Sequence, residues 1–236
     1  MRFTGLVIAK MHSERVKNKV ARDLCGRRLI NYAIETLNMV PEIDETIVFC
    51  SDPAIQKYIE PHLDYRFVQR PEWLDDGATT EIELFDEFIK ICKPEYIVSH
   101  WCTSPYIKPE TICDMVAAMK TGDYDSANVR VCLSEHFQNV MYDDTPMNFR
   151  FDHDVRSQAA EKVYGEVWTR VFPAELHTKY RRRVGFKPYW KTVSIAEGWD
   201  IDTEEEFRIA EVLGTINHSD RKPLLLEYMQ ARDWTE

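Results

Sequence analysis

The sequence predicts an α/β protein built on a three-layer, mostly parallel sheet with helices on both faces. Short apolar or β-branched runs alternate with segments of helical periodicity from residue 3 to residue 132, an order that favours parallel strands joined by helices. The chain has 236 residues, of which 44% are hydrophobic and 30% charged, a composition typical of globular proteins. We therefore expect residues 1–236 to form a single domain.

The first part of the chain alternates between predicted strands and predicted helices. Residues 80–92 carry Ile82, Phe85, Phe88 and Ile89 on one helical face, and Pro109 fits the first position of a helix because its missing N–H costs least there. We expect strands at Phe3–Ala9, Thr46–Ser51, Tyr65–Val68, Tyr96–His100 and Ala127–Cys132, and helices at Leu29–Val40, Thr80–Cys92 and Pro109–Lys120.

The pattern changes after Ser134. Residues 134–160 mix aromatic, acidic and turn-forming residues without periodicity, and so long an excursion in a compact domain is usually functional or an oligomer contact. We interpret it as an inserted excursion from the domain. Thr203–Glu206 reads as a capping box that opens a helix to about Leu213. Two further strands, Val167–Phe172 and Thr192–Ala196, and a last helix, Pro223–Ala231, are expected.

The charge is unevenly distributed. The formal net charge of −10 argues against non-specific binding to nucleic acids or anionic membranes. Residues 10–28 nevertheless hold seven cationic and two anionic side chains, and residues 179–191 hold six cationic and no anionic ones. The second run is as consistent with a solvated face as with a binding site.

The cysteines and the apolar runs bear on the compartment. The six cysteines lack the spacing of a zinc site, and the apolar run at the N-terminus is too short for a secretory leader. No stretch approaches the length of a membrane span. We expect a cytoplasmic protein without a membrane or nucleic-acid partner.

The first basic run directly follows the first predicted strand. In such folds the first strand-to-loop turn is the usual phosphate site. Lys10, Ser13, Arg15 and Lys19 offer a hydroxyl and several cations to a polyphosphate, although the glycine-rich phosphate-binding motifs are absent.

The stretch from Ala9 to Lys19 resembles the signature A-R-x-x-S-x-R-[LI]-P-x-K of the cytidylyltransferases that make CMP-linked sugar acids, the acylneuraminate cytidylyltransferases and the CMP-Kdo synthetases. Five further segments resemble motifs of this family in matching order up to about residue 210: Leu24–Ile30, Ser51-Asp52, Arg70–Leu74, Thr103–Pro105 and Trp199–Phe207. Any one of them is weak alone, and six in order on a compatible strand–helix pattern are a much more specific signal.

Several positions depart from the family pattern. Lys10 replaces an Arg, which keeps the charge and loses bidentate phosphate contact, and Lys17 replaces a Pro. Trp101-Cys102 stands where the neuraminate branch has Gln-Pro, and that Gln lies near the sugar acid. These departures bear more on which acid accepts the nucleotide than on the nucleotide chemistry itself.

The resemblance implies a fold of the nucleotide-diphospho-sugar-transferase type, with residues 134–160 as an inserted dimerisation and acceptor-site excursion. It also implies the transfer of CMP from CTP to a sugar acid, with release of pyrophosphate and attack of the anomeric hydroxyl on the α-phosphorus. Positioning and charge neutralisation dominate such transfers, and the sequence contains no nucleophile–base motif such as GxSxG. Asp200 and Asp202 are the candidate Mg²⁺ ligands, because i and i+2 side chains of an extended segment point the same way. In isolation the same two residues read better as an acidic run before a helix, and the family resemblance favours the metal role.

The remaining candidate residues fall into three groups. Arg15, Lys19 and Asp202 are expected to be catalytic. Contacts to CTP are expected from Ala9, Lys10, Ser13, Arg15, Lys19, Arg70 and Thr80, with Thr79 as the alternative to Thr80. Contacts to the acceptor are expected from Trp101, Ser104, Gln158 and Tyr164.

Other functions remain open from the sequence. The change at Trp101 invites a nucleotidyltransferase with a non-sugar acceptor such as a phosphonate. Asp200 and Asp202 also fit the metal motif of a glycosyltransferase, although that motif usually lies mid-chain. The change at Lys10 leaves room for a nucleotide-binding relative without catalysis. The expected partners are CTP, a small acidic acceptor and a second copy of the chain in a homodimer.

Overall fold

The computed structural model describes residues 1–13, 15–133, 135, 137–139, 145–148, 150, 156 and 161–217. Its strands are β1 (Phe3–Ile8), β2 (Asp23–Leu24), β3 (Arg27–Arg28), β4 (Ile43–Cys50), β5 (Arg66–Gln69), β6 (Tyr96–His100), β7 (Ser126–Leu133), β8 (Gln138–Asn139), β9 (Thr145–Pro146), β10 (Val163–Pro173) and β11 (Pro188–Val193). Its helices are α1 (Leu29–Asn38), α2 (Glu81–Cys92), α3 (Pro109–Lys120), α4 (Ala174–Tyr180) and α5 (Glu204–Asn217), with short 3-10 turns η1 (Lys19–Ala21), η2 (Pro53–Tyr58) and η3 (Glu72–Asp75).

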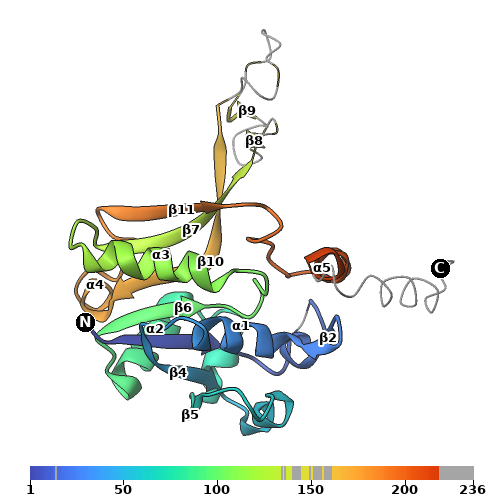
Figure 1. Cartoon of the computed structure of the whole chain (residues 1–236), viewed down its shortest axis with the longest axis vertical. Helices are drawn as coiled ribbons and strands as arrows, with labels where there is room; N and C mark the ends of the chain where they lie inside the picture. Colours follow the sequence, from blue (N-terminus) through green and yellow to red (C-terminus); the bar gives the residue numbers. More distant parts are fainter. Residues whose placement is uncertain are drawn as a thin grey trace, which may run out of the picture.

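Seven strands form the central sheet, in the order β11-β7-β10-β6-β1-β4-β5 (Figure 1). β10 is antiparallel to both of its neighbours, and the other adjacent pairs are parallel. The chain proceeds from β1 toward β4 and β5 and then returns to the opposite side of β1 with β6. The predicted fold class, a mostly parallel sheet with helices, is confirmed.

Helices cover both faces of this sheet. On one face, Val7 of β1 packs in a cluster with Ile34 of α1 and Met115 of α3. On the other face, the neighbouring Leu6 packs in a cluster with Phe85 of α2 and with residues of α4. The strands at the centre are buried on both sides, which explains why their sequences read as nearly continuous apolar runs.

A third, smaller cluster joins the two ends of the described chain. Ile201, three residues before α5, and Phe207, within α5, pack with Val16, Leu24 and Leu29. This contact brings the acidic segment before α5 against the basic loop that follows β1.

The second half of the chain differs from the prediction in three elements. β10 begins at Val163, four residues earlier than expected, and α4 was not predicted at all. The predicted strand Thr192–Ala196 is wrong in register, because β11 spans Pro188–Val193 and pairs with β7. Tyr189 packs against Tyr124 there, with ring centroids 5.3 Å apart, so an aromatic contact supports a strand that the neighbouring lysines concealed. The expected helix Pro223–Ala231 lies outside the described residues.

Among the described residues, no helix is both long and apolar enough to cross a membrane.

Candidate active site

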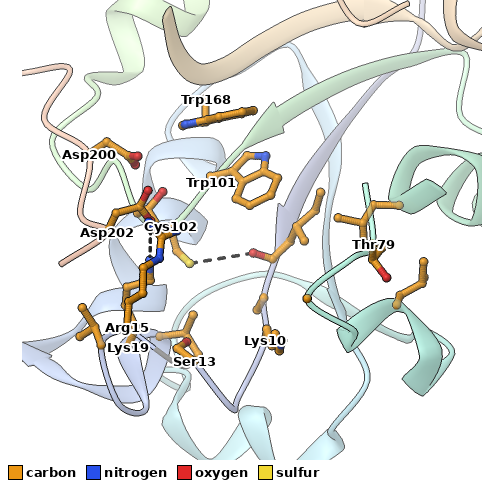
Figure 2. A pocket seen from close by; sticks show the side chains of 18 of the residues that line it. Lys10, Ser13, Arg15, Lys19, Thr79, Trp101, Cys102, Trp168, Asp200 and Asp202 are labelled. Carbon is orange, nitrogen blue, oxygen red and sulfur yellow. Dashed lines mark hydrogen bonds and ion pairs between the residues drawn. The ribbon is translucent and has the colours of Figure 1, made fainter. Parts of the chain in front are cut away.

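A cavity of about 500 Å³ opens where β1, β5 and β6 end. The strand order reverses at β1, and the crevice outside such a reversal is where open α/β sheets bind their ligands. Figure 2 shows side chains that line this cavity. Nine of the residues singled out from the sequence line it: Ala9, Lys10, Ser13, Arg15, Lys19, Arg70, Trp101, Asp200 and Asp202.

The segment Asp200–Asp202 alternates between the core and the cavity. Ile201 is fully buried in the third cluster, and its N–H donates to the Thr103 carbonyl at 2.9 Å. Asp200 and Asp202, on either side of it, both line the cavity. Ser104 is buried and donates to Asp200 Oδ1 at 3.2 Å. The predicted i, i+2 arrangement of the two carboxylates is therefore present.

Two cations of the loop after β1 contact Asp202. Arg15 Nη2 and Lys19 Nζ each lie 3.1 Å from Asp202 Oδ1. Lys19 Nζ also donates to the Ile201 carbonyl at 2.7 Å, and this lysine side chain is largely buried. The basic loop and the acidic segment thus form one cluster, as Figure 2 shows.

Asp200 is the more buried of the two carboxylates. Burial raises the pKa of Asp200, and the nearby Asp202 raises it further, while hydrogen bonds from Thr103 and Ser104 and the charge of Lys19 oppose that shift. A divalent cation would relieve both effects, because it favours the ionised form of each carboxylate.

The two carboxylates fit Mg²⁺ and do not form a closed metal site of their own. Nowhere in the described part of the chain do three or more His, Cys, Asp or Glu side chains gather as metal ligands. Mg²⁺ is usually held by one or two carboxylates together with phosphate oxygens and water. Asp200 and Asp202 would then hold an ion that arrives with a polyphosphate.

Arg70 is a buried cation at the cavity. It follows β5, is only 3% exposed, and pairs through Nη2 with Asp75 Oδ1 at 2.5 Å. Its Nε and Nη1 are buried and have no hydrogen-bond partner among the described residues. Buried charge-bearing groups rarely remain unpaired, so this guanidinium has capacity for an anionic ligand.

Asp75 organises the loop around Arg70. Its carboxylate also accepts a hydrogen bond from Ser51, and its carbonyl accepts one from Lys10 Nζ. Ala9 lines the same part of the cavity, and its N–H already donates to the Phe49 carbonyl at 3.1 Å. Lys10, which follows β1, and Arg70, which follows β5, are thus linked through Asp75.

The prediction for Thr80 is corrected by one residue. Thr80 caps α2: its hydroxyl accepts from the Glu83 N–H at 3.3 Å, and its own N–H donates to Glu83 Oε2 at 2.7 Å. The neighbouring Thr79 lines the cavity instead, beside Asp76 and Gly77. The capping box was visible in the sequence as T-E-I-E, and it accounts for the hydroxyl of Thr80.

The predicted acceptor residues are only partly brought together. Trp101 lines the cavity, whereas Ser104 lies behind Asp200 and does not line it. Tyr164 lies in β10 outside the cavity, 44% exposed, with the Arg130 guanidinium 3.7 Å from its ring centroid. Gln158 lies outside the described residues.

Trp168 and Cys102 line the cavity and were missed. Trp168 lies in β10, where its carbonyl accepts from the Trp101 N–H at 3.3 Å. Its position beside Trp101 depends on an antiparallel pairing that the sequence pattern did not reveal. Burial raises the pKa of Cys102 to about 12, so its thiol stays protonated at neutral pH. A protonated thiol is a poor nucleophile, so Cys102 is not suited to covalent catalysis.

Comparison with known proteins assigns a family to this site. A family model described as "Cytidylyltransferase" matches residues 4–229, nearly the whole chain. Among the curated proteins that were searched, none matches the chain.

Solved structures share the fold at low sequence identity. A CMP:2-keto-3-deoxy-manno-octonic acid synthetase complexed with CTP is 12% identical, with a TM-score of 0.67, and the match covers 92% of this chain and all of that one. The 4-diphosphocytidyl-2C-methyl-D-erythritol synthase from Anaerococcus prevotii is 14% identical, with a TM-score of 0.61 and coverage of 89% and 95%. These neighbours show the same fold, and the family match shows the chemistry class, a CTP-using nucleotidyltransferase. With its cations and carboxylates gathered at the ends of the strands and the family model spanning residues 4–229, this chain belongs to the cytidylyltransferase family.

Proposed function

We propose that this enzyme transfers CMP from CTP to a sugar acid, such as a 3-deoxy-ulosonate or a nonulosonate, and releases pyrophosphate. The observation that carries the proposal is the cluster of Arg15, Lys19 and Asp202 at the end of β1, with Asp200 beside it. Its cations suit a polyphosphate, and its carboxylates suit the metal ion that accompanies one.

The cavity supports an in-line transfer. The anomeric hydroxyl oxygen of the acceptor bonds to the α-phosphorus, the bond from that phosphorus to the bridging oxygen breaks, and pyrophosphate leaves with the electron pair. The hydroxyl proton passes to water. Arg15 and Lys19 neutralise the charge that builds on the leaving group, and Arg70 holds the nucleotide.

Asp200 and Asp202 are the proposed Mg²⁺ ligands. When bound, the ion neutralises phosphate charge and holds the phosphate oxygens in place. Asp202 pairs with Arg15 and Lys19. If Asp202 held the ion instead, both cations would be available to phosphate oxygens.

The structural neighbours favour two kinds of acceptor. The synthetase complexed with CTP is named for an octonic acid, whereas the other neighbour is named for a diphosphocytidyl ester of an erythritol, which points to a polyol phosphate. The ordered motifs from Ala9 to Phe207 resemble the enzymes that make CMP-sugar acids and support the first kind.

Pyrophosphate release tests the proposal directly. CTP, UTP, ATP and GTP are each offered with Mg²⁺ and with a panel of 3-deoxy-ulosonates, nonulosonates, phosphonates and methylerythritol phosphate. We expect release with CTP and a sugar acid. Release with the polyol phosphate or a phosphonate alone would show that the acceptor class is wrong.

The variant Asp202→Asn tests the metal site in the same assay. We expect its turnover to fall by about 10²–10³-fold, the usual effect of removing one preorganised charge interaction from a transfer site. Glu205→Gln is the matched control, because Glu205 is an exposed carboxylate three residues further along the same acidic run. Equal turnover of Asp202→Asn and wild type would contradict the metal role.

A further inference from the structure

A second cavity lies beside the loop that follows β1. Its volume is about 550 Å³, which is ample for a small ligand. Three cations, two carboxylates and one aromatic ring are among the residues that line it: Lys17, Asn18, Ala21, Arg22, Asp23, Arg28, Tyr58 and Glu211. None of them lines the active-site cavity, so the transfer of CMP gives this second cavity no role.

One short loop separates the two cavities. Arg15 and Lys19 line the active-site cavity and contact Asp202 (Figure 2), whereas Lys17, which lies between them in the sequence, lines the second cavity. Val16 is fully buried in the third cluster and anchors the loop. Arg15 and Lys19 therefore serve one cavity, and Lys17 serves the other.

Two cations of the second cavity are available to an anion. Within the described part of the chain, neither Lys17 nor Arg28 forms an ion pair, and both side chains are exposed. The Arg28 guanidinium carbon lies 6.0 Å from the ring centroid of Tyr58. Lys17 also stands where the motif that this loop resembles has Pro, so that motif does not account for it. Side chains of this kind bind phosphate oxygens through charge-assisted hydrogen bonds.

Arg22 connects the second cavity to the acidic segment. Its Nη1 lies 2.8 and 2.6 Å from the two carboxylate oxygens of Glu204, and its guanidinium carbon lies 3.9 Å from the ring centroid of Phe207. Glu204 begins α5, two residues after Asp202. An anion bound to Arg22 and Lys17 would therefore contact the basic loop and a partner of the acidic segment together.

We propose that the second cavity binds a small phosphate ester that carries hydroxyl groups, such as a sugar phosphate, and that this ligand and CTP weaken each other's binding. Lys17, Arg22 and Arg28 suit the phosphate. The side-chain oxygens of Asn18 and Asp23 suit the hydroxyl groups, because both accept hydrogen bonds.

The coupling between the two ligands is negative because both are anions. A phosphate beside Lys17 lowers the positive potential that Arg15 and Lys19 present to the active-site cavity, so CTP binds less tightly. By linkage, CTP weakens the binding of the phosphate ester by the same factor. The second cavity would thus lower the use of CTP when phosphate esters accumulate.

A matched pair of probes tests whether the cavity binds a phosphate ester. Glucose 6-phosphate and glucose differ only in the phosphate, and each is titrated into the wild-type enzyme in a calorimeter. We expect glucose 6-phosphate to bind with a Kd in about the millimolar range or below, and glucose to give no binding.

The same titration at increasing CTP concentrations, with Mg²⁺ and without an acceptor, tests the coupling. We expect the apparent Kd of glucose 6-phosphate to rise by about fivefold and then to level off once CTP saturates its own site. Competition for a single site would instead raise the apparent Kd without limit. The two kinds of curve therefore distinguish a second site from binding of the probe at the CTP site.

Variants assign the binding to the cavity. We expect Lys17→Gln and Arg28→Gln each to weaken glucose 6-phosphate binding by at least about tenfold, the effect of losing a hydrogen bond to a charged group. Lys17→Arg, which keeps the charge, should retain binding. Lys57→Gln is the matched control, because Lys57 is exposed, precedes Tyr58 and does not line the cavity. Thermal melting of each variant checks that it folds.

Several results would overturn the inference. These are no binding of glucose 6-phosphate, equal binding of glucose, an unchanged affinity in either Lys17→Gln or Arg28→Gln, and an equal loss in Lys57→Gln. An apparent Kd that CTP leaves unchanged, or raises without limit, would overturn it as well. The pyrophosphate assay reports on the acceptor separately, so the proposed function and this inference can fail independently.

Discussion

At Asp200, burial disfavours the ionised carboxylate, whereas the charge of Lys19 favours it. Its carboxylate is held by Ser104 beside Asp202, and burial raises its pKa above the ordinary value of 3.8. A side chain kept ionised in such a place costs folding stability, and enzymes tolerate that cost where a bound ligand uses the charge.

We expect Asp200→Asn to raise the melting temperature at neutral pH while it abolishes CMP transfer. The pKa of Asp200 is higher in the folded protein than in the unfolded chain, so protonation of Asp200 favours folding. This contribution to the free energy of unfolding is complete below the unfolded pKa and is lost as the pH rises through the folded pKa. The neutral amide avoids that loss, so its advantage is largest at pH 7 and disappears toward about pH 4. Melting curves across this range measure it, with the exposed Asp123→Asn as the control. A lower melting temperature for Asp200→Asn at pH 7 would contradict the assignment.

Arg70 carries the second residue-scale prediction. Its Nε and Nη1 are buried beside the cavity and have no hydrogen-bond partner within the described part of the chain. We therefore expect Arg70→Met to weaken CTP binding by about 10- to 100-fold, the range for a hydrogen bond to a charged group. Calorimetry with CTP alone measures this. Arg66→Met is the matched control, since Arg66 lies in β5, the strand that Arg70 follows. It pairs with Glu45 at 2.9 Å and does not line the cavity. An unchanged Kd for Arg70→Met would refute the role.

For single residues, the sequence predicted which charged side chains gather at the site. It predicted less well which residues from distant parts of the chain lie beside each other. Asp200 and Asp202 follow from the two-residue period of an extended chain, and Lys19 from its place after the first strand. Trp168 could not be predicted, because it reaches Trp101 only through the antiparallel β6–β10 pairing.

At the scale of elements, the start of α5 positions the acidic segment. Glu206 Oε2 accepts from the N–H of Asp202 at 2.8 Å and from the N–H of Thr203 at 2.7 Å, and the Thr203 hydroxyl accepts from the Glu206 N–H at 3.2 Å. The predicted capping box is thus present and extends to the residue proposed as a metal ligand. A helix cap here also fixes a carboxylate in the cavity.

We therefore expect Glu206→Ala to increase the Mg²⁺ concentration needed for half-maximal activity, by about three- to tenfold, besides lowering stability by about 1 kcal/mol as loss of a cap does. The chain contains its own control: Glu83→Ala breaks the equivalent cap of α2, between Thr80 and Glu83, and touches neither aspartate. Melting curves and Mg²⁺ titrations of both variants measure the two effects. An equal Mg²⁺ requirement in the two would show that the α5 cap is purely structural.

The bounds of helices and strands were predictable where buried apolar residues set the sequence pattern. They were less predictable for strands near the surface. Tyr96–His100 and Pro109–Lys120 agree with β6 and α3 residue for residue, because their apolar periods are clear. β11 was displaced because its lysine-rich surroundings read as a solvated run. In the structure Lys191 of β11 pairs with Asp114 of α3 at 2.5 Å, so its charge is paired with a helix that covers the sheet.

At the scale of the whole molecule, the two basic runs have different roles. In the second run, Arg181 forms an ion pair with Asp86, and Arg183 forms one with Glu81. These cations are thus paired with carboxylates of the same chain. The first run keeps Arg15 and Lys19 at the cavity. The net charge of −10 therefore surrounds a local anion site, an arrangement that composition alone does not show.

The oligomeric state gives the last prediction, and it starts from the ends of β7 and β10. β11 pairs with β7 only as far as Val131, and β6 pairs with β10 only from Thr169 onward. Beyond these points Leu133 and Val163 pair in a two-stranded ribbon that leads into the excursion of residues 134–160 (Figure 1). A two-stranded ribbon is marginal in water unless something packs against it.

We expect a second copy of the chain to supply that packing, so that light scattering at micromolar concentration gives twice the mass of one 27.8 kDa chain. Val163→Asp should then halve the measured mass, because a charge buried in an apolar contact is strongly unfavourable. Val212→Asp is the control, because Val212 is an apolar residue, 49% exposed, on α5. A wild-type chain that stays at the mass of one copy would show that the ribbon is stabilised without a partner. A Val163→Asp variant that stays at two copies would show that the copies do not meet at Val163.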